Sequence, residues 1–148
     1  MNGLCLEDLS LDQSAEIAHT VTDADIRAFA AVSGDNNPVH LDEAYAAATP
    51  FKTRIAHGML SAGYISAVLG TRLPGPGAIY ISQTLNFRAP VRIGDTVEVT
   101  VSVAELVPKR FRARLTCSCA VDGEVVLDGE AWVKVPSKQS GGRPLPRV

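Results

Sequence analysis

The chain has 148 residues, of which 46% are hydrophobic and 20% charged, and its formal net charge is −2. That length is typical of one domain with a single core, which buries about two thirds of the surface that the unfolded chain exposes. Because no basic excess creates a positive field, the composition argues against nucleic acid as a partner.

The sequence shows no targeting or membrane signal. Residues 1–8 lack the basic region and the continuous apolar run of a signal peptide, and no run approaches the roughly 18 apolar residues that span a membrane. The three cysteines, Cys5, Cys117 and Cys119, form no C-x-x-C motif and have no Cys/His pair to complete a zinc site. We therefore expect a reduced, soluble, cytoplasmic protein.

The first predicted elements are a strand and a helix. Residues 15–21 alternate between apolar and polar side chains, as a half-buried strand does. Thr22 and Asp25 have the spacing of a capping box, with Asp in place of the usual Glu, and open a helix over residues 23–32. Gly34 ends that helix.

The loop that follows, Ser33-Gly34-Asp35-Asn36-Asn37-Pro38-Val39-His40, places a carboxylate and an imidazole five residues apart. Its glycine, asparagines and proline favour a conformation outside any regular helix. A histidine that titrates near neutrality can exchange protons, in either direction, with a water that it shares with a carboxylate. Asp35 and His40 are therefore the candidate acid/base pair, whereas a metal site would need more ligands.

Two further helices are predicted before the chain changes character. Residues 42–48 form a short helix that begins with its own acidic residues. The almost uncharged run 59–69 follows Gly58 and predicts a helix that is apolar nearly all round, ended by Gly70 and Pro74. Such a helix must be buried on most of its sides.

The second half of the chain has the period of strands. Residues 78–87, 95–107, 111–121 and 125–135 alternate and are rich in Val, Ile and Thr, and Asp122-Gly123 is a two-residue hairpin signal. Consecutive antiparallel strands after one buried helix indicate an α+β fold, in which a sheet wraps around a central helix. Residues 137–148, with two glycines and two prolines, predict a disordered tail after a domain of residues 1–136.

The segment from Phe29 to His40, followed by Ala46, resembles the signature of the MaoC-like, (R)-specific enoyl-CoA hydratases. The resemblance continues through His57-Gly58-Met59-Leu60 and through Gly94-Asp95 at the start of a strand, and so covers about residues 12–136. A Gly-Asp-x-Asn-Pro-x-His motif with a downstream His-Gly-Met is far more specific than a catalytic pair alone. Nothing in the loop departs from this pattern.

This resemblance implies a hot-dog fold and a homodimer with active sites between the subunits. It implies reversible syn addition of water to a trans-2-enoyl-CoA, which gives the (R)-3-hydroxyacyl-CoA, without a metal or a redox cofactor. The substrate is then an acyl-CoA thioester, with short to medium acyl chains expected, and polyhydroxyalkanoate synthesis is one pathway that could use the product. The catalytic residues of the family correspond to Asp35 and His40, and the backbone amide that polarises the thioester carbonyl corresponds to that of Gly58.

The residues support this chemistry independently. Hydration of an enoyl thioester needs a base for water, an acid for the α-carbon, and donors for the enolate-like oxygen that develops between these events. We assign Asp35 as the group that orients and deprotonates water and His40 as its partner, and leave open which of them delivers the α-proton. Gly58, at a helix N-terminus, offers an unobstructed N–H and the positive end of the helix dipole.

Other residues have both a functional and a plain structural interpretation. Ser66 and Leu69 share one face of the central helix with Ala62 and are predicted to contact the acyl chain, unless that face only packs in the core. His57 is interpreted as a structural residue at the entry to the helix. The cations that could bind the phosphates of CoA, or an acidic carrier protein, are Arg54, Arg88, Arg92, Lys109, Arg110, Arg112 and Arg114.

Three alternatives stand beside the hydratase. The same chemistry in reverse describes a 3-hydroxyacyl-thioester dehydratase that acts on acyl carrier protein. A hot-dog thioesterase normally has an acidic residue on the central helix, and residues 59–69 contain none. A non-catalytic, acyl-CoA-binding partner subunit would have no need of both Asp35 and His40.

Overall fold

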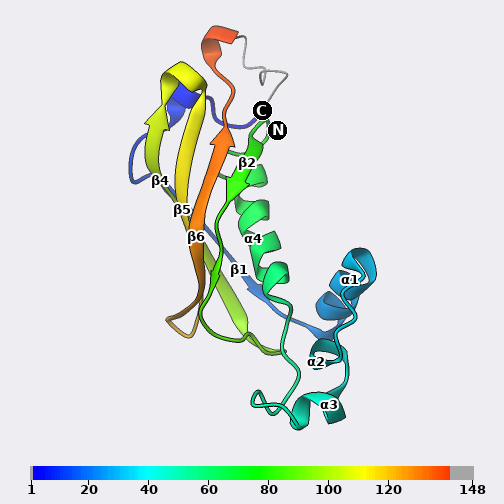
Figure 1. The fold of residues 1–148 in the computed structure, drawn as a ribbon. Helices are drawn as coiled ribbons and strands as arrows, with labels where there is room; N and C mark the ends of the chain where they lie inside the picture. Colours follow the sequence, from blue (N-terminus) through cyan, green and yellow to red (C-terminus); the bar gives the residue numbers. More distant parts are fainter. Residues whose placement is uncertain (1, 141–148) are drawn as a thin grey trace.

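The computed structural model of the chain describes residues 2–140, and Figure 1 shows the order of its elements. The first half contains the 3-10 turn η1 (Leu6–Asp8), strand β1 (Ser14–Thr20) and the helices α1 (Asp23–Ser33), α2 (Pro38–Leu41), α3 (Glu43–Ala47) and α4 (Gly58–Thr71). The second half contains the strands β2 (Ile79–Gln83), β3 (Asn86–Phe87), β4 (Thr96–Val107), β5 (Arg112–Val121) and β6 (Glu124–Lys134), with the 3-10 turns η2 (Pro108–Arg110) and η3 (Lys138–Ser140).

The strands form one antiparallel sheet against which α4 packs. The strand order is β1-β4-β5-β6-β2, and β3 also pairs with β6. Helix α4 contacts β1, β4, β5 and β6, and Figure 1 shows it lying along one face of the sheet. This arrangement confirms the predicted α+β architecture and the hot-dog fold.

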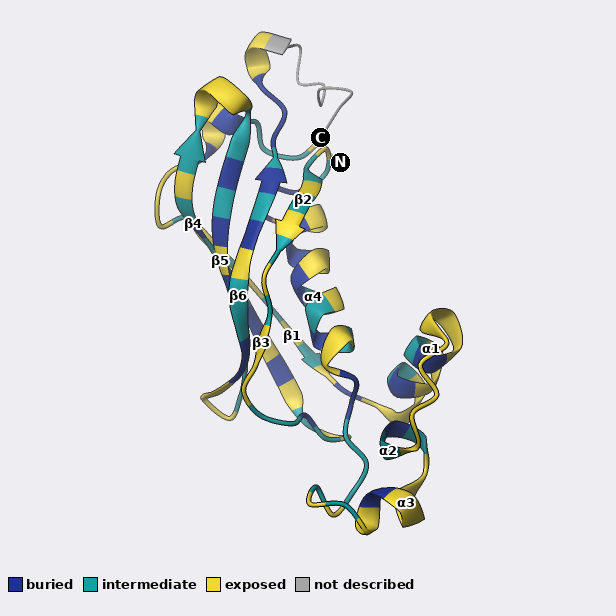
Figure 2. Cartoon of the chain, in the orientation of Figure 1, coloured by how far each residue is buried: buried dark blue, intermediate teal, exposed yellow. Residues whose placement is uncertain are grey.

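The core lies between that face of the sheet and α4. Every second residue of β4 from Val97 to Val103, and of β5 from Ala113 to Cys119, is at most 3% exposed. These side chains pack with Ile65 on α4, and complete burial of one large aliphatic side chain stabilises the fold by about 1.5–3 kcal/mol. The period-two pattern of the sequence therefore predicted these half-buried strands correctly, and the alternating colours of the strands in Figure 2 show their buried and exposed sides.

The predicted strand over residues 78–87 is wrong in two respects. It is divided into β2 and β3, and both pair with β6 instead of the next strand in sequence, β4. At the division, a Cβ on Gly129 of β6 would lie 1.8 Å from the carbonyl oxygen of Thr84. The backbone of Thr84 thus comes too close to β6 for any side chain there, and the absence of one at Gly129 permits the irregularity.

The predicted disorder of residues 137–148 is wrong at its start. Ser137 is 1% exposed, and its hydroxyl donates a hydrogen bond of 2.5 Å to the carboxylate of Glu7. The backbone N–H of Lys138 donates to the other carboxylate oxygen at 3.1 Å. The segment after β6 is therefore tied to η1 through Ser137 and Lys138, while residues 141–148 lie outside the described residues.

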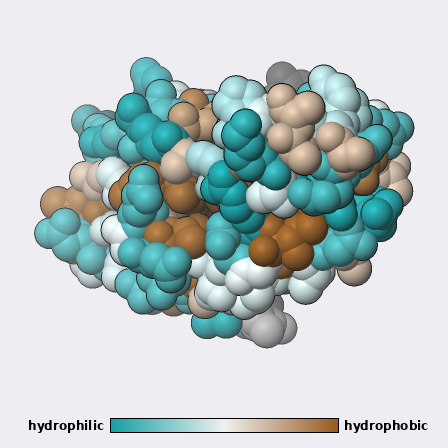
Figure 3. All heavy atoms as spheres, turned by 90° about the horizontal axis from the view of Figure 1, so that it is seen from below, coloured by the Kyte–Doolittle hydropathy of each residue, from teal (hydrophilic) through white to brown (hydrophobic). Residues whose placement is uncertain are grey.

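Helices α1, α2 and α3 form a segment that extends beyond one end of the sheet (Figure 1). Much of the outer surface of α1 and α3 is exposed (Figure 2). Seen from this end, the surface shows hydrophobic side chains between hydrophilic ones (Figure 3). Within residues 2–140, no helix combines the length and the apolar character that crossing a bilayer requires.

Candidate active site

Helix α1 leads the chain into the candidate site. The predicted capping box is present, because the Thr22 hydroxyl accepts from the N–H of Asp25 at 3.1 Å and the Asp25 carboxylate accepts from the N–H of Thr22 at 3.0 Å. Gly34 ends the helix in the left-handed region, with φ of 80°, and its N–H donates to the carbonyl of Ala30. Both predicted helix ends are therefore confirmed.

The loop after Gly34 is built from short-range polar contacts. The N–H of Asp35 donates to the Ser33 hydroxyl at 3.1 Å, and the Asp35 carboxylate accepts from the N–H of Asn37 at 3.2 Å. The Asn37 side chain then caps α2, whose first residue is Pro38. The prediction that this whole stretch avoids regular helix is wrong at its end, because His40 lies in the single turn of α2.

His40 is held in one tautomer. Its side chain is buried, with the residue 8% exposed, and Nδ1 lies 2.8 Å from the carbonyl oxygen of Ile55. A carbonyl only accepts, so Nδ1 carries the proton that is donated. Nε2 is the remaining ring nitrogen, and in the neutral imidazole it has a lone pair for a substrate or water proton.

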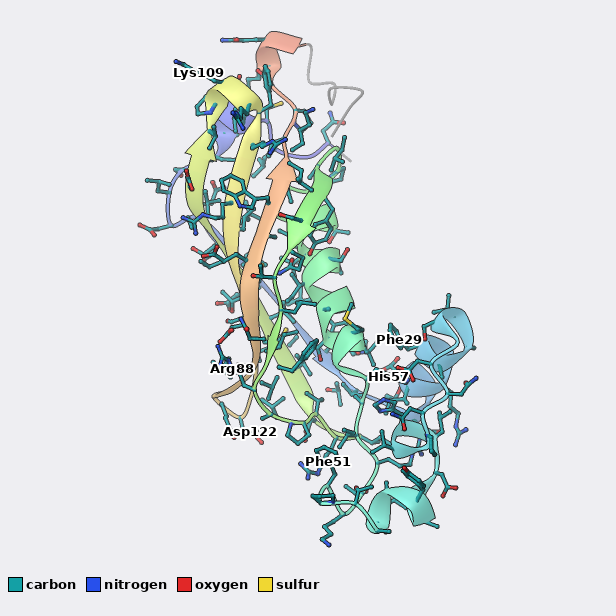
Figure 4. All side chains as sticks on the ribbon, viewed as in Figure 1. Phe29, Phe51, His57, Arg88, Lys109 and Asp122 are labelled. Carbon is teal, nitrogen blue, oxygen red and sulfur yellow. The ribbon has the colours of Figure 1, made fainter. Side chains whose placement is uncertain are left out.

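His57 joins the two catalytic candidates. Its ring stacks on that of His40 with centroids 3.8 Å apart and planes 29° apart, and its Nε2–H donates to the backbone carbonyl of Asp35 at 3.0 Å. Phe29 of α1 packs against His57 at a centroid distance of 4.8 Å, and Figure 4 shows both rings between α1 and the start of α4. These contacts agree with the interpretation of His57 as structural, and they show that it holds the loop of Asp35 and the ring of His40.

The surroundings of His40 favour its neutral form. Burial lowers the pKa of the imidazole below its ordinary value of 6.5, and neighbouring His57 lowers it further, whereas the hydrogen bond to Ile55 and the charge of Asp35 act in the opposite direction. At neutral pH, His40 is then ready to accept a proton. Asp35 is exposed, so a water molecule can reach the space between the two side chains.

One ligand atom from each of Asp35, His40 and His57 lies within 4.8 Å of the other two. A zinc ion lies in the plane of each imidazole that binds it, about 2.0–2.1 Å from the nitrogen. The two stacked rings direct their nitrogen lone pairs along nearly parallel planes, so the lone pairs do not converge on one ion. This donor set suits a shared water better than a metal.

A cavity of about 470 Å³, mainly apolar, is lined by His40, whereas Asp35 is not among its lining residues. Its polar side chains come from His40, His57, Ser61 and Arg88. The rest of its wall is formed by Phe51, Ile55, Ala56, Gly58, Met59, Phe87, Ala89, Pro90, Val91, Val126 and Leu127. A few polar groups at the edge of an apolar cavity are typical of a site for a small ligand with a hydrophobic chain.

Gly58 lines this cavity as the first residue of α4. The N-cap residue, His57, makes no side-chain hydrogen bond to the helix, and the first N–H groups of a helix have no partner within it. A Cβ at Gly58 would lie 2.5 Å from the ring of Phe87. The missing side chain therefore makes room for the ring of Phe87, and the role of the Gly58 amide as an oxyanion donor stays a prediction.

The structure does not bring Ser66 and Leu69 to this cavity. Leu69 is 2% exposed in the core, and Ser66 lies on the exposed side of α4. The buried stripe of α4 instead runs through Ser61, Ile65, Val68 and Leu69. Sequence reasoning missed Ser61, although its position three residues after Gly58 places it on the same face of the helix. The substrate contacts of Ser66 and Leu69 stay a prediction.

The predicted phosphate-binding cations are widely separated. Of the seven, only Arg88 is among the described residues that line the cavity, where it pairs with Asp128 at 3.2 Å. Figure 4 shows Lys109 at the opposite end of the sheet from His57. Arg114 is paired with Glu105 and Glu130, and Arg54 is enclosed between α1 and α2 by contacts to Asp23 and the backbone of His40.

Three comparisons with known proteins agree with this geometry. A family model described as a MaoC like domain matches residues 9–119. A 3-hydroxybutyryl-CoA dehydratase from Methylorubrum extorquens is 64% identical over 136 residues, which cover 92% of this chain and 87% of that protein. An (R)-specific enoyl-CoA hydratase from Rhodospirillum rubrum is 59% identical over 132 residues, which cover 89% of this chain and 92% of that protein.

The fold comparison gives the same result. The unliganded structure of R-hydratase PhaJ1 from Pseudomonas aeruginosa superposes with a TM-score of 0.87 at 48% identity, and the match covers 91% of this chain and 87% of that one. The matched family model spans both Asp35 and His40 as well as Gly58. With its motif, its fold and its relatives in agreement, the chain belongs to the MaoC-like family.

Proposed function

We propose that the chain is an (R)-specific enoyl-CoA hydratase, which adds water reversibly to a trans-2-enoyl-CoA to give the (R)-3-hydroxyacyl-CoA. The observation that carries this function is that a carboxylate oxygen of Asp35 lies within 4.8 Å of a ring nitrogen of His40, whose side chain lines an apolar cavity together with Gly58. An enoyl thioester has a matching arrangement of groups, with an apolar chain, an electrophilic Cβ and a carbonyl that becomes enolate-like. The relatives named as hydratase and dehydratase support the same reaction.

Asp35 and His40 together can accept and return every proton that moves in this reaction. In hydration, the oxygen of a water held between Asp35 and His40 bonds to Cβ, one water proton passes to the pair, and the pair returns a proton to Cα. The second water proton remains on the product hydroxyl. Because both new bonds form beside the same pair, addition is syn, and dehydration follows the same steps backwards.

Gly58 supplies the remaining requirement, which is a hydrogen-bond donor for the thioester oxygen. Negative charge moves to the thioester oxygen while Cβ is attacked, and a backbone N–H at a helix N-terminus stabilises that charge through its hydrogen bond and the helix dipole. This donor is fixed before the reaction begins. We expect no metal or redox cofactor, since the described side chains and one amide supply the acid, the base and the oxyanion donor.

The direct test is hydration of crotonyl-CoA by the purified protein. We expect loss of the enoyl-thioester absorbance and, on chiral analysis, a product that is the (R)-alcohol. Activity on crotonyl-carrier protein but not on crotonyl-CoA would assign the chain to the carrier-protein dehydratases instead. A protein that hydrates neither thioester, at any enoyl chain length, would overturn the proposed function and favour the hypothesis of a non-catalytic partner subunit.

We also propose that the active form is a homodimer. Helix α4 was expected to be buried on most sides, yet its outer face is exposed in the single chain, with Met59 52% exposed. That face carries the small residues Gly63, Ser66, Ala67 and Gly70, which permit close approach of another backbone. Strand β2 adds an open sheet edge beside it. In a dimer, Ser66 would face the second copy and could reach its substrate.

Sedimentation tests the dimer directly. We expect a mass of twice 15.7 kDa for the wild type, and dissociation with loss of activity for Ala67→Glu, because a charge on the small-residue face prevents close packing. Thr116→Glu is the control, since Thr116 is exposed on β5. A monomeric, active wild type would overturn the dimer, and an Ala67→Glu protein that keeps the dimer mass would overturn its assignment to this face of α4.

A further inference from the structure

We propose that Arg54 is a positioning residue for the reaction, which holds His40 in the place and the tautomer that proton transfer requires. The inference rests on the hydratase function proposed above. The Nε–H of Arg54 donates to the backbone carbonyl of His40 at 2.6 Å, and Nη2–H donates to the carboxylate of Asp23 at 2.6 Å. Arg54 thus links the start of α1 to the helix that carries the catalytic imidazole.

The burial of Arg54 strengthens its hydrogen bond to the His40 carbonyl, whereas its pair with Asp23 is open to solvent because the Asp23 side chain is 49% exposed. The side chain of Arg54 is 11% exposed, whereas that of Arg27, which pairs with the same Asp23, is 57% exposed. Solvent-exposed ion pairs contribute little because water and salt screen them. Hydrogen bonds between charged groups gain strength where water is largely excluded. Arg54 and Arg27 therefore share Asp23 as a partner, but only the buried Arg54 is placed to hold α2 in position.

Helix α2 needs such a contact because of its length. It has four residues, and a helix so short leaves its last carbonyl groups without partners inside the helix. The carbonyl of His40 is one of these groups. An arginine at a helix C-terminus both satisfies a carbonyl and complements the negative end of the dipole, so Arg54 stabilises the turn that positions the ring.

Ile55, the residue after Arg54, also contacts α2, both at the imidazole ring of His40 and at the backbone of Val39. The Ile55 carbonyl accepts from Nδ1 of His40 at 2.8 Å, and its N–H donates to the carbonyl of Val39 at 3.3 Å. Arg54 anchors this connecting segment against α1. Without that anchor, the Ile55 carbonyl can move relative to the imidazole, and the ring then loses both its orientation and its fixed Nδ1–H tautomer.

The contacts also argue against the phosphate-binding role that the sequence suggested for Arg54. Two of its donors are already used by His40 and Asp23, and Arg54 does not belong to the lining of the cavity. A phosphate anchor acts mainly on substrate affinity, and its loss raises KM. A positioning residue acts on the transition state, and its loss lowers kcat.

The test compares Arg54→Met with Arg27→Met on crotonyl-CoA. Methionine keeps much of the side-chain volume but offers neither charge nor N–H. We expect kcat of Arg54→Met to fall about 10- to 100-fold, as small displacements of a catalytic group do, with KM changed less than about twofold. Arg27→Met should keep wild-type kcat. Arg54→Lys, which keeps the charge but not the planar fork, should recover part of the loss.

The pH profile separates positioning from a loss of folded protein. The charged and titratable groups around His40 are Asp35 of the loop, His57 before α4, and Arg54 with its partners Asp23 and Glu43. Burial lowers the pKa of His40, so the acid limb of wild-type kcat/KM lies below pH 6.5. In Arg54→Met, the imidazole of His40 should become more hydrated, its pKa should rise, and the acid limb should move toward pH 6.5. A smaller folded fraction would instead lower the whole profile without moving the limb.

Nitrogen NMR of the imidazole gives a readout that does not depend on activity. We expect His40 of the wild type to show the Nδ1–H tautomer and His40 of Arg54→Met to show a mixture. Unchanged kcat, an unchanged acid limb or an unchanged tautomer in Arg54→Met would overturn the inference, and raised KM with normal kcat would support phosphate binding in its place. A wild type without hydratase activity would overturn the proposed function, while the tautomer result would still test the contact.

Discussion

Asp35→Asn and His40→Gln should each lower kcat/KM for crotonyl-CoA hydration by about 10²- to 10⁴-fold, the contribution expected of general acid/base catalysis. Asparagine keeps the oxygen that accepts from the N–H of Asn37 but cannot exchange a proton. Glutamine keeps a polar side chain of similar length, with an amide in place of Nε2, and likewise cannot act as a base. His40→Asn, whose amide takes the place of the Nδ1 that donates to Ile55, shows whether a loss comes from that hydrogen bond or from the proton transfer.

Two matched substitutions control for this experiment. His19→Gln changes a histidine that pairs with Asp25 and lies outside the residues lining the cavity, and Asp12→Asn changes an acid at positive φ, where asparagine is tolerated. Both controls should keep wild-type activity. If either Asp35→Asn or His40→Gln is folded and remains within about tenfold of wild type, the assignment of the pair is wrong.

The local parts of the site were predictable because short-range chemistry determines them. Thr22 and Asp25 are three residues apart and cap α1 with contacts to each other. Gly34 adopts the positive φ that ends the helix, and the motif that it begins places Asp35 one residue later. These features depend on a few neighbouring residues, and the sequence displays those residues directly.

The rotation of α4 could not be predicted in the same way. The helix is apolar nearly all round, so its sequence has no polar side to indicate which residues face solvent. The prediction of Ser66 as a cavity residue followed from choosing one of several equivalent stripes, and the structure places the stripe through Ser61 and Ile65. Contacts with the strands fix that rotation, and they depend on residues far away in sequence.

Long-range contacts also explain why the partners of His57 and Arg54 could not be predicted. His57 stacks on a ring that is 17 residues earlier and donates to a carbonyl that is 22 residues earlier. Arg54 joins Asp23 and His40 across two helices. Neither contact has a spacing rule in the sequence, because each one joins residues from separate elements that only the tertiary structure brings together.

The second large effect concerns the amide of Gly58. Proline at this position removes the N–H, and the first position of a helix is the one at which proline is best tolerated. His57, with ψ of 133°, already has the extended conformation that a residue before proline adopts. The remaining obstacle is the Phe87 ring, which a Cβ would approach to 2.5 Å. Phe87 is 54% exposed, so Phe87→Ala provides a background in which the new side chain fits.

In that background, Gly58→Pro should lower kcat by about 10²- to 10³-fold relative to Gly58→Ala, the usual cost of losing one oxyanion donor. Alanine is the matched control because it adds the Cβ and keeps the N–H. The loss should appear in kcat, since the amide bonds most strongly to the charge of the transition state, whereas a proline ring that merely blocked the thioester would raise KM. Equal kcat values for the two variants would mean that another group stabilises the thioester oxygen.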